Sequence, residues 1–93
     1  MARFLIEVPH EPDPASCDRA IEIFRKSGSH FLTHAGWGCK DGNHKAFIIA
    51  EVESRDEARL IVPPVYRAQA RITELGQFSI EHTQEMYSSH QSA

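Results

Sequence analysis

The first residues of the chain alternate between hydrophobic and polar positions. In the segment ARFLIEVPH, the side chains of Phe4, Ile6 and Val8 occupy every second position. This period of two predicts a strand with these three side chains on one face of a sheet. Pro9 ends the predicted strand, because proline has no backbone N–H to donate to a neighbouring strand.

Two later segments carry helix signals. Asp13 as N-cap, Pro14 at the first helical position and Gly28 as the stop predict an amphipathic helix over EPDPASCDRAIEIFRKSG. A second helix is predicted to follow the capping box SRDE, in which Ser54 is the cap. The two prolines at 63–64 end or kink that helix.

A β-hairpin is predicted around CKDGNH, where Asp41-Gly42 suits a type I′ turn with positive φ at both positions. With these two residues as the loop, Cys39 lies opposite His44, and extended runs continue on both sides. The segment ARITELGQFS then reads as the last strand. Continued along the ribbon, the register pairs Trp37 with Ala46, Gly36 with Phe47, His34 with Ile49, Leu32 with Glu51 and His30 with Glu53.

The order strand, helix, strand, strand, helix, strand predicts one domain over residues 1–80. Its fold class is α+β: a ferredoxin-like βαββαβ sandwich with a four-stranded antiparallel sheet and helices on one face. Residues 81–93 are expected to form a C-terminal tail, a short helix followed by a frayed end.

Composition narrows the range of partners. The chain of 93 residues has a formal net charge of -3 and its basic residues are dispersed, so nucleic acid is not an expected partner. No apolar run approaches the roughly 20 residues that span a bilayer, and the N-terminal apolar segment is too short for a secretory signal. We therefore expect a cytoplasmic protein without membrane contact, in which the two cysteines are free thiols.

The second face of the predicted sheet carries Leu5, Leu32, Phe47 and Ile49, which favour cover by another subunit. With this two-faced sheet, the element order and the length, the chain resembles the dimeric α+β barrel superfamily. The resemblance implies a homodimer or higher homo-oligomer that binds a small hydrophobic ligand. It further implies either a cofactor-free isomerase, cyclase or monooxygenase, or a non-catalytic metal-binding, haem-binding or stress-responsive module.

Acid–base chemistry is one hypothesis for this open sheet face. The predicted register places His34 diagonal to Glu51, and Glu7 of the first strand shares their face. A histidine beside carboxylates in a partly apolar cavity suits general acid–base catalysis, since its pKa lies near neutral pH. The alternative is a polar dimer interface in which these groups pair with each other or with basic residues.

Aromatic and basic side chains are candidates for ligand contact. Phe47 lies on the open face, and Tyr66 and Arg67 follow the two prolines on a segment that could overhang a cleft. Trp37 is also a candidate, although its predicted place on the helix-covered face suits packing equally well.

Metal binding is the competing hypothesis. Cys39 and His44 face each other across the predicted turn, and His30 and His34 share one face of the predicted strand. The two pairs point to opposite faces, and neither makes a four-ligand set, so no cofactor is predicted. Zinc, another transition metal or haem remains the alternative. Cys17 is interpreted as an inert, buried thiol on the apolar stripe of the first helix. His10 follows the first strand and is interpreted as an exposed loop residue, with a position at the mouth of a pocket as the alternative.

Overall fold

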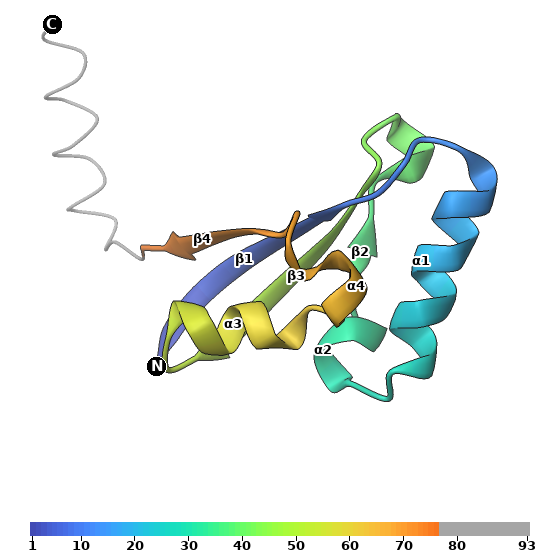
Figure 1. Ribbon diagram of the computed structural model, residues 1–93. Helices are drawn as coiled ribbons and strands as arrows, with labels where there is room; N and C mark the ends of the chain where they lie inside the picture. The colour runs from blue at the N-terminus through green and yellow to red at the C-terminus, as the bar shows by residue number, and fades with distance from the viewer. Residues whose placement is uncertain (77–93) are drawn as a thin grey trace, which may run out of the picture.

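The computed structural model describes residues 1–76, and within them the chain is an α+β protein with a four-stranded antiparallel sheet (Figure 1). The sheet has the order β2-β3-β1-β4, which is compatible with the predicted ferredoxin-like fold. The predicted tail, residues 81–93, lies outside the described residues. The strands are β1 (Ala2–Pro9), β2 (Gly36–Trp37), β3 (Lys45–Val52) and β4 (Arg71–Leu75), and the helices are α1 (Pro14–Lys26), α2 (His30–Thr33), the 3-10 helix η1 (Cys39–Asp41), α3 (Arg55–Ile61) and α4 (Pro64–Arg67).

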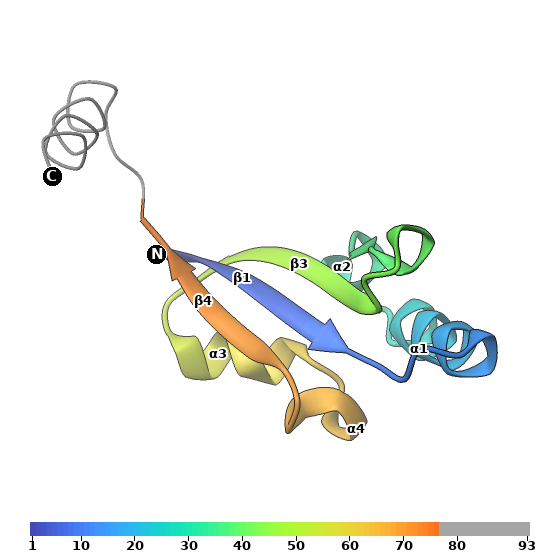
Figure 2. The same cartoon turned by 90° about the horizontal axis from the view of Figure 1, so that it is seen from above.

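The core lies between the sheet and the helices. Figure 2, the view from above, shows α3 beside β4, α4 where the chain enters β4, and α1 beyond the end of β1. The predicted inward residues of β1, Phe4, Ile6 and Val8, are buried, which confirms the alternation read from the sequence. Together with Phe24 of α1 they belong to one continuous cluster of buried hydrophobic side chains. Burial of such a cluster is the main favourable contribution to folding.

The first helix is the one that the sequence predicted. The Asp13 carboxylate accepts a hydrogen bond from the backbone N–H of Ser16 at 2.8 Å, and Pro14 stands at the first helical position. The helix ends at Lys26, and Gly28 follows with a φ of 73°. Glycine adopts this left-handed conformation without steric cost, which is why it stops the helix here.

The third helix begins at the predicted cap. The hydroxyl of Ser54 accepts a hydrogen bond from the N–H of Glu57 at 3.2 Å, and the Glu57 carboxylate accepts one from the N–H of Glu53 at 2.9 Å. After Ile61 the chain turns through the two prolines at 63–64, and the second of them begins α4. The prediction that these prolines end the helix is confirmed.

The hairpin connection differs from the predicted two-residue turn. Gly36 pairs with Phe47 and Trp37 with Ala46, so the predicted register is confirmed where strand exists. Beyond Trp37, however, the chain forms η1, and Asp41 does not have positive φ. Only Gly42 does, at 78°. The type I′ turn was therefore wrong, because the 3-10 turn takes up the residues that would have extended both strands.

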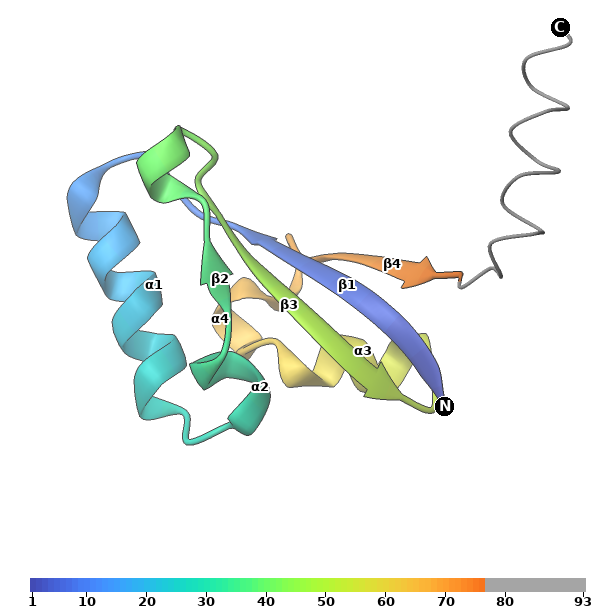
Figure 3. The same ribbon diagram turned by 180° about the vertical axis from the view of Figure 1, so that it is seen from behind.

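The second strand is also shorter than predicted. Residues 30–33 form α2 because the hydroxyl of Ser29 accepts a hydrogen bond from the N–H of Leu32, as an N-cap does. The predicted pairs of Leu32 with Glu51 and of His30 with Glu53 therefore do not form. Leu32, expected on the open face, is buried in the core. Figure 3 shows α2 leading into the short β2 at the sheet edge.

Within residues 1–76, one face of the sheet has no helix over it. By the register of β1 with β3, this open face carries Leu5, Glu7, Phe47, Ile49 and Glu51. Ile49 is 48% exposed, although it is a large hydrophobic residue in the middle of a strand. Among the described residues, no helix combines the length and apolar character that crossing a membrane requires.

Candidate metal centre

The first ligand-bearing element is α1, which presents Cys17 in its first turn. The backbone N–H of Cys17 donates to the carbonyl of Asp13 at 3.0 Å, so the cap and the thiol belong to the same turn. Further along the helix, the ring of Phe24 packs against Trp37 of β2, with ring centroids 4.9 Å apart. This contact holds α1 against the β2 edge and thereby directs the Cys17 thiol toward the end of the hairpin.

Cys39 is held by the loop that joins β2 to β3. The carbonyl of Gly38 accepts hydrogen bonds from the N–H groups of Asp41 at 3.0 Å and of Asn43 at 2.9 Å. The backbone of Asn43 comes so close to Gly38 that an added Cβ would lie 2.5 Å from its carbonyl oxygen. The glycine at this position is therefore required by a close backbone approach.

His10 and His44 are brought together by the pairing of β1 with β3. Pro9 at the end of β1 is opposite Lys45 at the start of β3. Just beyond this pair, the N–H of His10 donates to the carbonyl of His44 at 3.1 Å. The two imidazole rings lie edge to face, with centroids 5.9 Å apart. The sheet register thus fixes the separation of the two histidines.

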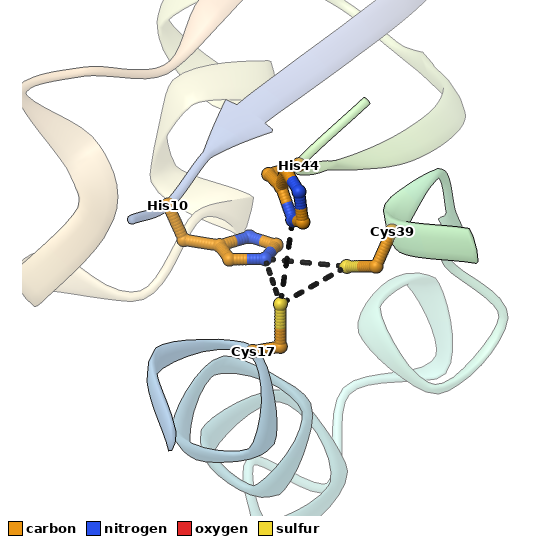
Figure 4. Close-up of side chains that lie close together, drawn as sticks. All are labelled: His10, Cys17, Cys39 and His44. Carbon is orange, nitrogen blue, oxygen red and sulfur yellow. Dashed lines mark hydrogen bonds between the residues drawn. The ribbon is translucent and has the colours of Figure 1, made fainter. Parts of the chain in front are cut away.

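These four residues form what we call the Cys2His2 cluster: His10, Cys17, Cys39 and His44 (Figure 4). One ligand atom from each residue lies within 4.8 Å of all the others. Sγ of Cys17 is 3.1 Å from Nε2 of His10, 3.4 Å from Sγ of Cys39 and 3.5 Å from Nδ1 of His44. Sγ of Cys39 is 3.3 Å from Nε2 of His10.

The spacing of these atoms suits one tetrahedral ion. Zinc–sulfur bonds of about 2.3 Å and zinc–nitrogen bonds of about 2.0–2.1 Å place neighbouring ligand atoms about 3.4–3.8 Å apart. Four of the six separations, from 3.1 Å to 3.5 Å, overlap the lower part of that range, and the other two are within 4.8 Å. Small side-chain adjustments would accommodate the ion.

The electrostatic environment favours a neutral imidazole at His10. Burial lowers the pKa of His10, the neighbouring His44 lowers it further, and Asp13 opposes both effects. A neutral ring has a lone pair available on Nε2, the atom that faces the two sulfurs. Nδ1 of His10 is buried and has no hydrogen-bond partner among the described residues. In the neutral tautomer with the proton on Nδ1, Nε2 is the free ligand atom.

The Cys17 thiol is held in its protonated form when no ion is present. Burial raises the pKa of Cys17, and the hydrogen bond to Cys39 raises it further. A cation at the centre of the cluster would reverse this preference, because a metal ion stabilises the coordinating thiolate. The surroundings of Cys17 thus disfavour a thiolate on its own but suit a thiolate whose charge is balanced by a bound cation.

Comparisons of the chain with protein-family models, with curated proteins and with solved structures found no match. The chemistry of the centre is therefore interpreted from its own residues and geometry.

The sequence pointed to half of this cluster. Cys39 and His44 were recognised as neighbours, but two ligands were judged too few for a metal site. His10, which was expected to be exposed, is half-buried, and Cys17, which was expected to be buried, is half-buried as well. The sequence interpretation assigned no ligand role to either residue, although each offers a ligand atom to the cluster. A signal for them was present, because in the expected strand order the end of β1 lies beside the start of β3 and α1 begins next to that point.

The other predicted metal pair lies elsewhere. His30 and His34 are close, with ring centroids 4.5 Å apart, but Nδ1 of His34 faces the carbonyl of His30 at 2.8 Å. Both residues are exposed at the ends of α2 rather than on a strand. Neither belongs to the Cys2His2 cluster.

The predicted acid–base residues are not gathered at one place. His34 lines a hollow of about 370 Å³ with Phe47, whereas Glu51 lines a different one of about 610 Å³ with Arg3. Glu7 forms an ion pair with Lys45 at 3.1 Å. The strand that was to align His34 with Glu51 is absent at His34, so their expected diagonal contact was wrong. The catalytic role of these residues stays a prediction.

The predicted ligand-contacting residues have structural partners. The Arg67 guanidinium donates to the backbone carbonyl of Val62 at 2.9 Å, which ties α4 to the end of α3. Tyr66 is buried and, with His10, lines a hollow of about 440 Å³. Trp37 packs against α1, as the structural interpretation of that residue expected.

Proposed function

We propose that the protein binds one zinc ion through the Cys2His2 cluster. The observation that carries this proposal is the convergence of four ligand atoms, from three separate segments, within 4.8 Å of one another. His10 follows β1, Cys17 lies in the first turn of α1, and both Cys39 and His44 lie in the loop between β2 and β3. An ion at this point would link the end of β1, the start of α1 and the β2–β3 loop.

The donor set supports zinc over other ions. Two thiolates with two imidazoles in a tetrahedral arrangement are typical of zinc, whereas calcium and magnesium require oxygen ligands. The convergence of four donors on one point also favours a single ion over haem, whose iron receives protein ligands only along its axis. With all four positions supplied by side chains, the site has the closed character of a structural zinc centre.

Measurement of bound zinc in untagged protein tests this proposal. We expect one zinc ion per chain after gel filtration. Cys17→Ser should reduce zinc affinity by more than about 100-fold, the upper range for losing even an outer-shell partner. His34→Ala is the matched control, because His34 is an exposed histidine outside the cluster and its loss should leave zinc binding unchanged. Equal zinc content in the Cys17 variant and the unmodified chain would contradict the proposal.

A second candidate function is the binding of a small hydrophobic ligand between two copies of the chain. It is favoured by the open face of the sheet, where Ile49 is 48% exposed beside Leu5 and Phe47. Two such faces packed together would form a dimeric α+β barrel around a shared cavity. This arrangement removes the exposed apolar surface from water and is the completed form of the ferredoxin-like fold expected from the sequence.

Sedimentation of the Phe47→Glu variant tests the dimer. A charge at this position should dissociate the dimer, because the carboxylate would be buried without a partner. Lys40→Glu, a charge change in an exposed loop residue at the hairpin end, serves as the control and should sediment like the unmodified chain. An unmodified chain that sediments as a monomer at all concentrations would refute this second function.

A further inference from the structure

The two cysteines of the Cys2His2 cluster lie in direct contact with each other. Cys17 is on α1 and Cys39 is on η1, and the Cys17 thiol donates a hydrogen bond to Sγ of Cys39 over 3.4 Å. A disulfide bond requires a sulfur–sulfur distance of about 2.05 Å. The two sulfurs therefore need to approach each other by about 1.4 Å, which is on the scale of a small side-chain rotation.

Each of the two cysteines is a partly exposed residue. These are also the only two cysteines of the 93-residue chain, so no third thiol competes for the product. A small oxidant that reaches the cluster would meet two sulfurs that are already adjacent. The folded structure, rather than a chance encounter, keeps the two sulfurs adjacent.

We propose that Cys17 and Cys39 form a reversible dithiol–disulfide couple, and that its oxidation by a hydroperoxide releases the zinc ion. The inference rests on the zinc site proposed above. It adds a redox activity and a means of regulation to that site, and its substrate class is hydrogen peroxide or an organic hydroperoxide.

The chemistry balances in two steps. One thiolate attacks the peroxide, an S–O bond forms and the O–O bond breaks; the departing oxygen takes a proton and leaves as water, or as an alcohol when the oxidant is an organic hydroperoxide. The second thiolate then attacks the sulfur of the sulfenic acid, an S–S bond forms, the S–O bond breaks, and the departing hydroxide takes a proton and leaves as water. The two sulfurs together lose two electrons and the peroxide gains them.

Loss of the zinc ion follows from the conversion of the two thiolates to a disulfide. A disulfide sulfur has no thiolate charge, and zinc is bound by the thiolate form of cysteine. His10 and His44 alone would leave the ion with two of its four protein ligands. Reduction by a dithiol such as dithiothreitol returns both thiols and restores the complete ligand set.

The test uses zinc-loaded, full-length protein treated with hydrogen peroxide in the presence of a chromogenic zinc chelator. We expect the release of one zinc ion for each pair of thiols lost. Intact mass spectrometry should show the loss of two hydrogen atoms per chain, at a rate independent of protein concentration. Dithiothreitol followed by removal of the chelator and addition of zinc should reverse both changes. Retention of zinc after thiol loss, or a mass gain from added oxygen in place of the hydrogen loss, would overturn the inference.

Metal-free protein separates this inference from the zinc proposal. Peroxide should form the same intramolecular disulfide in the metal-free chain, whereas Cys39→Ser should gain oxygen because Cys17 then has no partner sulfur. A chain that binds one zinc ion but forms no disulfide in either state refutes the redox couple alone. A chain that forms the disulfide but binds no zinc refutes the proposed function, and with it the release step.

Discussion

At the scale of single residues, the surroundings of Cys17 and of His10 shift their pKa values in opposite directions. Burial of Cys17 and its hydrogen bond to Cys39 raise the pKa of its thiol, so the metal-free chain keeps a proton there near neutral pH. His10 behaves in the opposite direction, because burial and His44 lower its pKa and keep the ring neutral to a lower pH than usual. Zinc must therefore displace a proton from Cys17 but meets little competition from protons at His10.

This difference predicts that zinc binding releases protons and weakens as pH falls. Because the pKa of Cys17 is above its usual value, little of this thiol is ionised in the metal-free chain near neutral pH. The ionised fraction becomes smaller still as the pH falls, and the apparent zinc affinity falls with it. Titration calorimetry near pH 7 in buffers of different ionisation enthalpy measures the protons released. We expect a binding enthalpy that depends on the buffer. A buffer-independent enthalpy would show that no thiol is deprotonated, and would exclude Cys17 as a ligand.

At the scale of elements, the loop between β2 and β3 determines where two of the four ligands lie. Cys39 is in η1 and His44 is just before β3, and Gly42 between them has a φ of 78°. The open space around the Cα of Gly42 shows that its conformation, not crowding, requires glycine. A side chain here would strain the loop that sets the distance between Cys39 and His44.

We therefore predict that Gly42→Val destabilises the fold by about 1–2 kcal/mol, the cost of a left-handed conformation for a residue with a side chain. The measurement is urea unfolding of the metal-free chain. Lys40→Val is the matched control, since it adds the same β-branched side chain to an exposed residue of the same loop that has negative φ. If the two variants unfold at the same urea concentration, the left-handed conformation of Gly42 contributes nothing to stability.

Elements of strong local pattern could be predicted from the sequence, and weakly patterned ones could not. Asp13 and Ser54 cap their helices as expected because capping depends on residues within one turn. The segment at residues 30–33 was misread because its apolar residues fit a short strand as well as one helical turn. At this segment the N-cap formed by Ser29 favours a helix over a strand. N-caps of the same kind identified the helices that follow Asp13 and Ser54.

At the scale of the whole molecule, the Cys2His2 cluster depends on long-range arrangement. The cluster joins residues that are far apart in sequence, and they meet only because β1 pairs with β3 and α1 begins at the same end of the sheet. Cys39 and His44 could be recognised as neighbours because one loop contains both. His10 and Cys17 could not be added from local pattern, since their approach depends on sheet order and on the packing of Phe24 against Trp37.

X-ray absorption at the zinc edge of the zinc-loaded protein tests the central claim most directly, because it reports the atoms bound to the ion. We predict two sulfur neighbours at about 2.3 Å and two nitrogen neighbours at about 2.0–2.1 Å, with imidazole multiple scattering from both histidines. His30→Ala should give the same spectrum, since His30 lies outside the cluster. A first shell of oxygen and nitrogen alone, or one that contains a single sulfur, would contradict the assignment of His10, Cys17, Cys39 and His44 as the ligands of one zinc ion.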